Sequence, residues 1–163
     1  MAQWLEDIEL GSRNNLGDWL MDAEEMMAFA HKFDPQPFHI DPEAAAKSHF
    51  GGIIASGWFT LACWMRAMIK HRNLQAEKYE FAVDKTTGPR PLIGPSPGFL
   101  NLTWPTPVRP GDVITFSATT AEKLVMKSRP GWGIIRSLNE GVNQNGELVL
   151  RYTGQGMVST RPK

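Results

Sequence analysis

A long apolar helix in the first half of the chain most constrains the fold. Ser56 is a natural N-cap, and the run from Trp58 to Ile69 that follows is interrupted only by Thr60 and Arg66. The run is too short to span a bilayer, so it predicts a buried core helix. Because a helix that is apolar on nearly every side must be surrounded, we expect a sheet that wraps around it.

The second half of the chain has the alternation of apolar and polar residues that is typical of strands. This alternation covers residues 100–104, 114–119, 132–143 and 147–160. Arg109–Asp112 predicts a tight turn with proline second and glycine third, and Asn145-Gly146 predicts a hairpin. Helices first and antiparallel strands after them indicate an α+β protein whose curved sheet encloses the long helix.

Composition narrows the class of protein. A length of 163 residues is that of one domain, so we expect a single domain over 1–163. Seventeen basic and seventeen acidic residues cancel, which gives no indication of a nucleic-acid or membrane partner. The one cysteine, Cys63, rules out an internal disulfide, and no apolar leader is recognised, so a cytoplasmic protein is expected. Glycines and prolines over 71–97 predict a long irregular connection.

Two shorter helices are predicted before the long one. Asp22 followed by Glu25 is an N-cap signal, and the helix should end near Phe33. Asp41 and Pro42 repeat the start signal, as N-cap and first helical residue. The first of these helices has an apolar stripe that is expected to face the core: Met26, Phe29, Ala30 and Phe33.

Between these helices lies the run Asp34-Pro35-Gln36-Pro37-Phe38-His39, which places a carboxylate and an imidazole five positions apart. Each proline disfavours the helical conformation of the residue before it, so the run is predicted to be non-helical and turned. In a straight strand Asp34 and His39 would point to opposite faces, so they meet only if the chain turns. On the residues alone, a turn held by a structural hydrogen bond competes with a catalytic pair.

Four runs together resemble the MaoC-like dehydratases, also called the R-specific enoyl-CoA hydratase group. They are the capped helix before Asp34, DPQPFHIDPEAA, FGGIIASG ahead of the long helix, and VRPGD, and they follow the family's order along nearly the whole chain. The resemblance implies the hotdog fold, a curved antiparallel sheet wrapped around a central helix. It also implies a homodimer or higher homo-oligomer that acts in acyl-CoA and fatty acid metabolism.

The resemblance implies a hydro-lyase that reversibly hydrates an enoyl thioester of coenzyme A or an acyl carrier. Asp34 and His39 match the family's catalytic pair, and Gly57 matches the residue whose amide polarises the thioester carbonyl. One water between the pair would serve the acid–base steps, while the Gly57 amide at a helix start would stabilise the enolate oxygen. We expect Asp34 to be the base and His39 to orient the water and pass the proton on, a division that the sequence leaves open.

Four further residues are assigned to substrate binding: Gln36, Phe38, Ser56 and Met65. Gln36 stands where the better-characterised hydratases have asparagine, and it can offer similar hydrogen bonds from a longer arm. Ser56 stands where many members have histidine. Met65 aligns with a serine of the family's long helix, which removes a polar contact.

Two alternative functions remain open. One is a hotdog acyl-CoA thioesterase, in which a carboxylate also serves but free thiol is released. The other is a non-catalytic acyl-thioester-binding subunit that lost turnover through the changes at Gln36 and Met65. No metal or other cofactor is expected beside the coenzyme A thioester, because His49 and His71 have no ligand spacing to His39.

Overall fold

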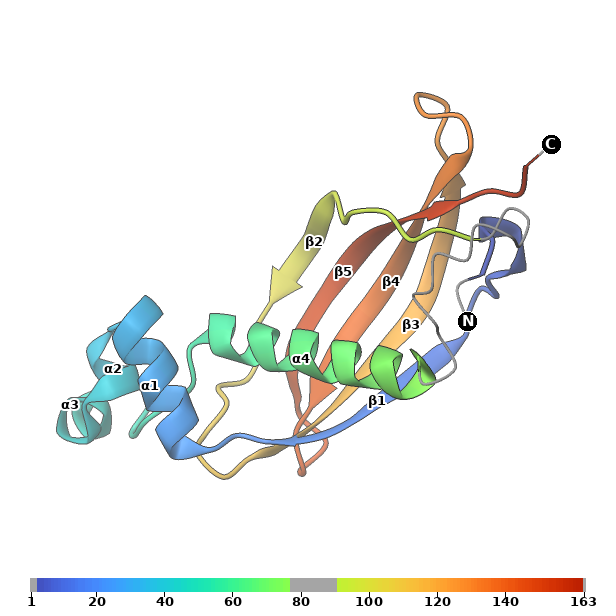
Figure 1. The fold of residues 1–163 in the computed structure, drawn as a ribbon. Helices are drawn as coiled ribbons and strands as arrows, with labels where there is room; N and C mark the ends of the chain where they lie inside the picture. The colour runs from blue at the N-terminus through green and yellow to red at the C-terminus, as the bar shows by residue number, and fades with distance from the viewer. Residues whose placement is uncertain (1–2, 77–90, 163) are drawn as a thin grey trace.

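The computed structural model of the protein describes residues 3–76 and 91–162. After strand β1 (Arg13–Leu20), the helices come first along the chain and the other four strands follow (Figure 1). In chain order they are η1 Leu5–Asp7, β1 Arg13–Leu20, α1 Ala23–Phe33, α2 Pro37–Ile40, α3 Pro42–Lys47, α4 Gly57–Ala76, β2 Gly98–Thr103, β3 Val113–Val125, β4 Trp132–Val142 and β5 Leu148–Ser159.

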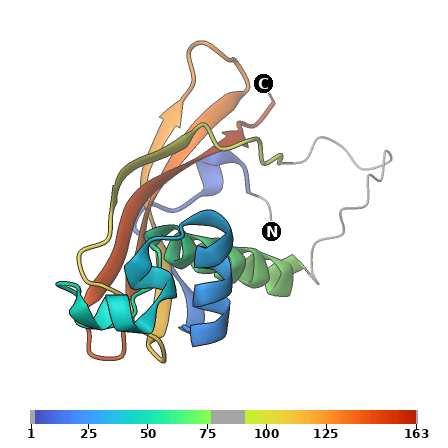
Figure 2. The same cartoon turned by 90° about the vertical axis from the view of Figure 1, so that its left-hand side faces the viewer.

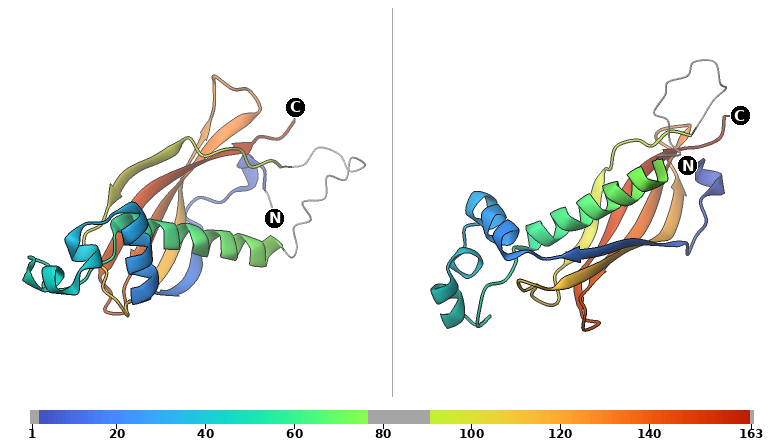
Figure 3. Two further views of the ribbon diagram at one scale, coloured as in Figure 1. Left: turned by 60° about the vertical axis from the view of Figure 1, so that its left-hand side comes forward. Right: turned by 60° about the horizontal axis from the view of Figure 1, so that its bottom comes forward.

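The strands form one five-stranded antiparallel sheet in the order β1-β3-β4-β5-β2. The sheet curves, and α4 lies along one of its faces (Figure 2). Helices α1, α2 and α3 gather at the N-terminal end of α4, as both views of Figure 3 show. A curved antiparallel sheet around a central helix is the hotdog fold, so the predicted α+β class and fold are confirmed.

Strands β2 to β5 lie where the alternating pattern predicts them, but β1 was not predicted. Only Leu16 is buried among the residues of β1, so the strand lacks the alternation that identifies the others. The edge strands β1 and β2 are both irregular. The pairing register shifts between Asn15 and Gly17 in β1 and between Leu100 and Thr103 in β2, which marks a bulge on each edge.

Helix α4 begins at Gly57, as predicted, and continues to Ala76. The irregular connection therefore starts later than predicted, because His71 and the residues after it are helical, and residues 77–90 of that connection lie outside the described ones. Apolar periodicity fades after Ile69, but arginine, leucine, glutamine and alanine in the last turns are all strong helix formers. Intrinsic propensity thus extends the helix beyond its apolar part.

The sheet covers only one side of α4. Phe59, Cys63, Trp64 and Ala67 are buried in the core, together with residues of β3 and β5. On the other side Trp58 is 53%, Met65 49% and Ile69 44% exposed. The expectation of a buried helix that the sheet surrounds is therefore wrong for these positions.

The turn at Arg109–Asp112 and the residue before it, Val108, bond to the two segments that lead into α1 and α4. Gly111 has a φ of 87°, which suits the third position of a type II turn. The Gly111 amide donates to the carbonyl of Met21, just before α1, over 2.9 Å, and the Ala55 amide donates to the carbonyl of Val108 over 2.8 Å. The turn therefore holds the starts of α1 and α4 beside the same end of the sheet.

Aspartate caps start α1 and α3 as predicted. The Asp22 side chain accepts hydrogen bonds from the amides of Glu24 and Glu25, and Asp41 caps α3 in the same way. Helix α1 ends at Phe33 as predicted, although Phe33 is 63% exposed rather than in the core.

No helix over residues 3–76 and 91–162 has the length and apolarity needed to cross a membrane.

One local prediction is wrong. The run from Asp34 to His39 is not free of helix, because α2 begins at Pro37. Proline fits the first helical position, where its missing amide hydrogen has no partner to lose. The residue before it, Gln36, is extended as predicted, with φ −77° and ψ 142°.

Loss of the α1 cap should destabilise the protein. We expect Asp22→Ala to lower the free energy of unfolding by about 1 kcal/mol, because two amides at the helix start lose their acceptor. Asp22→Asn keeps an acceptor oxygen and should unfold close to the wild type. Urea unfolding followed by circular dichroism measures both, and equal midpoints for Asp22→Ala and the wild type would contradict the cap's role.

Candidate active site

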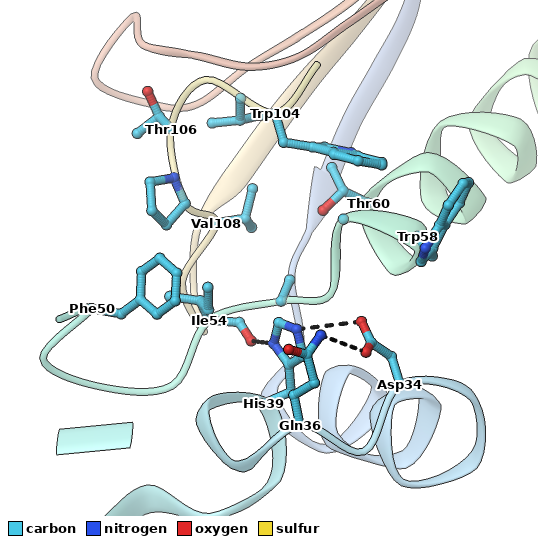
Figure 4. Close-up of a pocket in the computed structure, with 14 residues that line it drawn as sticks. Asp34, Gln36, His39, Phe50, Ile54, Trp58, Thr60, Trp104, Thr106 and Val108 are labelled. Carbon is cyan, nitrogen blue, oxygen red and sulfur yellow. Dashed lines mark hydrogen bonds and ion pairs between the residues drawn. The ribbon is translucent and has the colours of Figure 1, made fainter. Parts of the chain in front are cut away.

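A tight turn brings Asp34 and His39 together. The Gln36 amide donates to the carbonyl of Asp34 over 2.8 Å, and the His39 amide donates to the carbonyl of Gln36 over 2.9 Å. These bonds reverse the chain between α1 and α2. As a result, Nε2 of His39 lies 3.4 Å from Oδ2 of Asp34 (Figure 4).

The ring of His39 is buried, with a fixed orientation. Its Nδ1 lies 2.8 Å from the carbonyl oxygen of Ile54. Because a carbonyl oxygen only accepts, Nδ1 carries a hydrogen, and in the neutral ring Nε2 is the acceptor. The ring of Phe38 packs edge-on against His39, with centroids 4.5 Å apart, and it also contacts the ring of Phe50, with centroids 5.0 Å apart. His39 is thereby held with Nε2 towards Asp34.

Both carboxylate oxygens of Asp34 accept hydrogen bonds from neutral donors. Nε2 of Gln36 donates to Oδ1 over 2.8 Å, and Oγ of Ser56 donates to Oδ2 over 2.7 Å. Burial alone would raise the pKa of Asp34, but the bonds from Ser56 and Gln36 and the nearby His39 together lower it below its ordinary value. Asp34 is therefore a carboxylate at neutral pH.

The start of α4 faces the same space. The amide of Trp58 donates to Oγ of Ser56 over 3.3 Å. Across residues 3–76 and 91–162, the Gly57 amide donates to no protein group. An amide in the first turn of a helix lies at the positive end of the helix dipole, where it favours negative charge.

These groups border a pocket of about 310 Å³. Asp34, Gln36 and His39 lie at one side of it in Figure 4, and Trp104 and Thr106 lie across from them. Most of the remaining wall is apolar and comes from Phe50, Ile54, Ala55, Val108 and Val149. The pocket thus combines an apolar wall with a carboxylate, an imidazole and a helix start.

Trp104 packs directly on Gly57. A Cβ at position 57 would lie 2.6 Å from Cδ2 and from Cε2 of the Trp104 ring, well inside contact distance. Trp104 also meets Trp58 edge to face, with centroids 5.4 Å apart. Glycine at position 57 is therefore required by the close approach of the indole, independently of any role for its amide.

The predicted site residues fall into three groups. Those that line the pocket are Asp34, Gln36, His39 and Gly57. Ser56, fully buried, lies behind Asp34, and Phe38 packs behind His39, so both contact the pair rather than the cavity. Met65 is exposed and is not among the residues that line the pocket, so the structure does not support its assignment to substrate binding.

Sequence reasoning missed three features of the site. Thr60 lines the pocket and is 1% exposed, and its position as a polar residue in an apolar helical run is a signal that could have identified it. Trp104 follows β2 in an irregular segment, where no pattern predicts a contact with Gly57. The bond from Ser56 to Asp34 was missed because helix capping accounts for a serine at that position.

Neighbouring groups fix the loop that carries the pocket's apolar wall. Nη2 of Arg109 donates to the carbonyl of Phe50 over 2.6 Å, and the Ile54 amide donates to the carbonyl of Phe38 over 3.2 Å.

No group of three or more histidine, cysteine, aspartate or glutamate residues in the described part of the chain has a metal-binding arrangement.

A pocket at the start of the central helix, inside a curved antiparallel sheet, defines a hotdog-fold protein with a ligand-sized site. The family model of the MaoC-like domain matches residues 14–87. A MaoC-like dehydratase from Rhodospirillum rubrum is 36% identical, with 99% of both chains covered and a TM-score of 0.76. The chain belongs to the MaoC-like dehydratase family.

Two further proteins are similar to this chain. A monoamine oxidase regulatory protein from Archaeoglobus is 25% identical, with 99% of both chains covered and a TM-score of 0.80. The uncharacterized protein YdeM of Bacillus subtilis is 38% identical over 66 residues, which are 40% of this chain and 47% of that protein. The match thus spans about half the length of this curated relative.

The contact between Gly57 and Trp104 can be tested by paired substitution. We expect Gly57→Ala to lower the free energy of unfolding by about 1–3 kcal/mol, because the added methyl group forces the indole to move. Combining it with Trp104→Leu should recover part of that loss relative to Trp104→Leu alone.

Gly156→Ala is the matched control, since a Cβ there meets nothing within 4 Å. Chemical unfolding of the four variants and the wild type gives the coupling between positions 57 and 104. A Gly57→Ala cost that is unchanged in the Trp104→Leu background would contradict the steric interpretation.

Proposed function

We propose that the protein reversibly hydrates a trans-2-enoyl thioester, with Asp34 and His39 as its catalytic pair. The observation that carries this proposal is the 3.4 Å approach of two acceptor atoms, Nε2 of His39 and Oδ2 of Asp34, at the edge of a pocket. Two neighbouring acceptors suit one water molecule that donates a hydrogen to each. The oxygen of that water would then direct a lone pair into the pocket, towards the β carbon of the substrate.

In the proposed reaction one proton moves from the water to His39 and is then delivered to the α carbon. As the water oxygen bonds to the β carbon, its proton passes to Nε2 of His39. The electron pair of the carbon–carbon double bond shifts to the bond between the α carbon and the carbonyl carbon, and the carbonyl pair moves to the thioester oxygen. The Gly57 amide donates to this enolate oxygen. Return of the proton from Nε2 to the α carbon restores the thioester carbonyl, so one water is added in total. The reverse sequence is dehydration.

His39 is the proposed base in this scheme, and Asp34 holds the water and stabilises the imidazolium. Hydrogen bonds from Ser56 and Gln36 stabilise the charged form of Asp34, which makes it a weaker proton acceptor. An imidazole with a free Nε2 accepts a proton more readily. This division reverses the one expected from the sequence, and it follows from the two donors on the carboxylate.

The substrate is proposed to be a thioester of coenzyme A or of an acyl carrier. The apolar wall of the pocket suits an acyl group, and Gln36 at its edge has a second amide hydrogen for a polar substrate atom. The chemistry needs no metal or other cofactor. The buried thiol of Cys63 and the balanced charge fit the reducing cytoplasm, which is the proposed location.

Substitution of either member of the pair tests the reaction. We expect Asp34→Asn and His39→Ala to lower kcat/KM for hydration of crotonyl-CoA or a longer enoyl-CoA at least a hundredfold, the usual scale of general acid–base catalysis. Loss of enoyl absorbance measures the rate. His31→Ala is the control, because His31 is exposed and outside the pocket.

The two alternative functions give different results in the same assays. Release of free thiol from saturated acyl-CoAs, without hydration, would favour a thioesterase. Tight acyl-CoA binding without turnover of any enoyl thioester would favour a binding subunit. Retention of more than a tenth of the hydration rate by either Asp34→Asn or His39→Ala would contradict the proposed roles.

We propose that the protein is a homodimer or higher homo-oligomer. Exposed apolar side chains on α4 and on the edge strand β2 are the observation behind this: Trp58, Met65, Ile69, Phe99 and Leu100. Large exposed apolar residues on a few elements are typical of an interface.

Met65→Glu with Ile69→Glu should shift the mass measured by sedimentation towards the monomer, whereas Val125→Glu, at an exposed position near the β3–β4 turn, should not.

A further inference from the structure

We infer that Ser56 is a positioning residue that holds the Asp34 carboxylate in its working orientation, an inference that rests on the proposed hydration. Its Oγ lies 2.7 Å from Oδ2 of Asp34, and the side chain is fully buried. No protein donor other than the Trp58 amide contacts this hydroxyl in the described part of the chain. The role of Ser56 therefore goes beyond capping α4.

The direction of the Ser56 hydroxyl is determined by its two partners. The amide of Trp58 is a donor only, so Oγ must accept from it, over 3.3 Å. The carboxylate of Asp34 accepts only, so the single hydroxyl hydrogen points to Oδ2. A continuous chain of donors thus runs from the start of α4 to the carboxylate.

Two donors on opposite oxygens fix the rotation of the carboxylate. Gln36 holds Oδ1 and Ser56 holds Oδ2, so the plane of the Asp34 carboxylate has one favoured orientation. In this orientation Oδ2 faces Nε2 of His39. The bond from Ser56 also occupies one lone pair of Oδ2. The proposed catalytic water must therefore approach Oδ2 from the side of its other lone pair.

Ser56 also connects the two halves of the proposed site. It precedes Gly57 directly, so the residue that anchors Asp34 is bonded to the residue whose amide would stabilise the enolate oxygen. A displacement of the α4 start relative to α1 therefore moves both groups. The Ser56 side chain thus helps to hold the acid–base pair near the proposed oxyanion donor.

The charge on Asp34 depends on the same contact. Asp34 is faced by one titratable group in the described chain, His39 of α2, while Ser56 and Gln36 are neutral donors. The ionised carboxylate is the form that accepts the hydrogen bonds from Ser56 and Gln36. Removal of the Ser56 hydroxyl removes a donor that lowers the pKa of Asp34, so the carboxyl should take up its proton at higher pH.

The kinetics and a titration of Asp34 together distinguish positioning from simple capping. We expect Ser56→Ala to lower kcat for enoyl-CoA hydration about tenfold or more with little change in KM, and to raise the pKa of Asp34, followed by NMR of its carboxyl carbon. Ser56→Thr, which restores a hydroxyl, should recover most of both. Ser56→Gly removes the hydroxyl but remains an acceptable N-cap, so it covers the case that Ser56→Ala folds poorly.

Ser48→Ala is the matched control. Oγ of Ser48 donates to the carbonyl of Ala45 over 2.7 Å and accepts from the amide of Phe50, but it is not bonded to Asp34. Its loss should affect stability without changing kcat or the titration of Asp34. If Ser56→Gly and Ser56→Ala, both folded by circular dichroism, keep the wild-type kcat and the wild-type titration of Asp34, the inference is overturned.

The inference and the proposed function fail in different ways. A wild-type protein without hydration activity on any enoyl thioester contradicts the proposed function. NMR titration of the carboxyl carbon of Asp34 then still tests the contact itself, since Ser56→Gly should raise the midpoint. An unchanged midpoint would show that Ser56 does not act on Asp34.

Discussion

The hydrogen bond between His39 and the carbonyl of Ile54 is the interaction on which the rest of the site depends. It joins α2 to the segment that leads into α4, and it leaves Nε2 as the only ring atom able to exchange a proton with the pocket. Because the ring is buried, loss of this bond would leave a ring nitrogen without a partner, at a cost of about 1–3 kcal/mol. The fold therefore fixes both where the imidazole lies and which of its nitrogens is free for chemistry.

The half-buried carboxylate next to that imidazole keeps its charge because other groups donate hydrogen bonds to it. Asp34 accepts from Gln36 and Ser56, so its cost of burial is offset by donors rather than by a fixed ion pair. The same donors weaken it as a base. In the proposed reaction the carboxylate therefore stays charged throughout, whereas the imidazole gains and then loses a proton.

Local signals in the sequence predict much of the fold, because the caps at Asp22 and Asp41, the apolar run of α4 and the four alternating strands act over short distances. The strand β1 escapes prediction because its residues are mostly exposed and follow no alternation. For the site, the spacing of Asp34 and His39 is visible in the sequence. Contacts made by Ser56 and Trp104 are not, because they join segments that only the folded chain brings together.

The irregular pairing in β1 and β2 bears on how copies of this protein can associate. Edge strands with continuous ladders are templates for open-ended strand addition, and here both edges are interrupted by a bulge. Phe99 and Leu100 are exposed on one of these edges, where a regular ladder beside them would favour aggregation. The bulges therefore let the protein keep apolar side chains at its surface while discouraging the growth of fibrous assemblies.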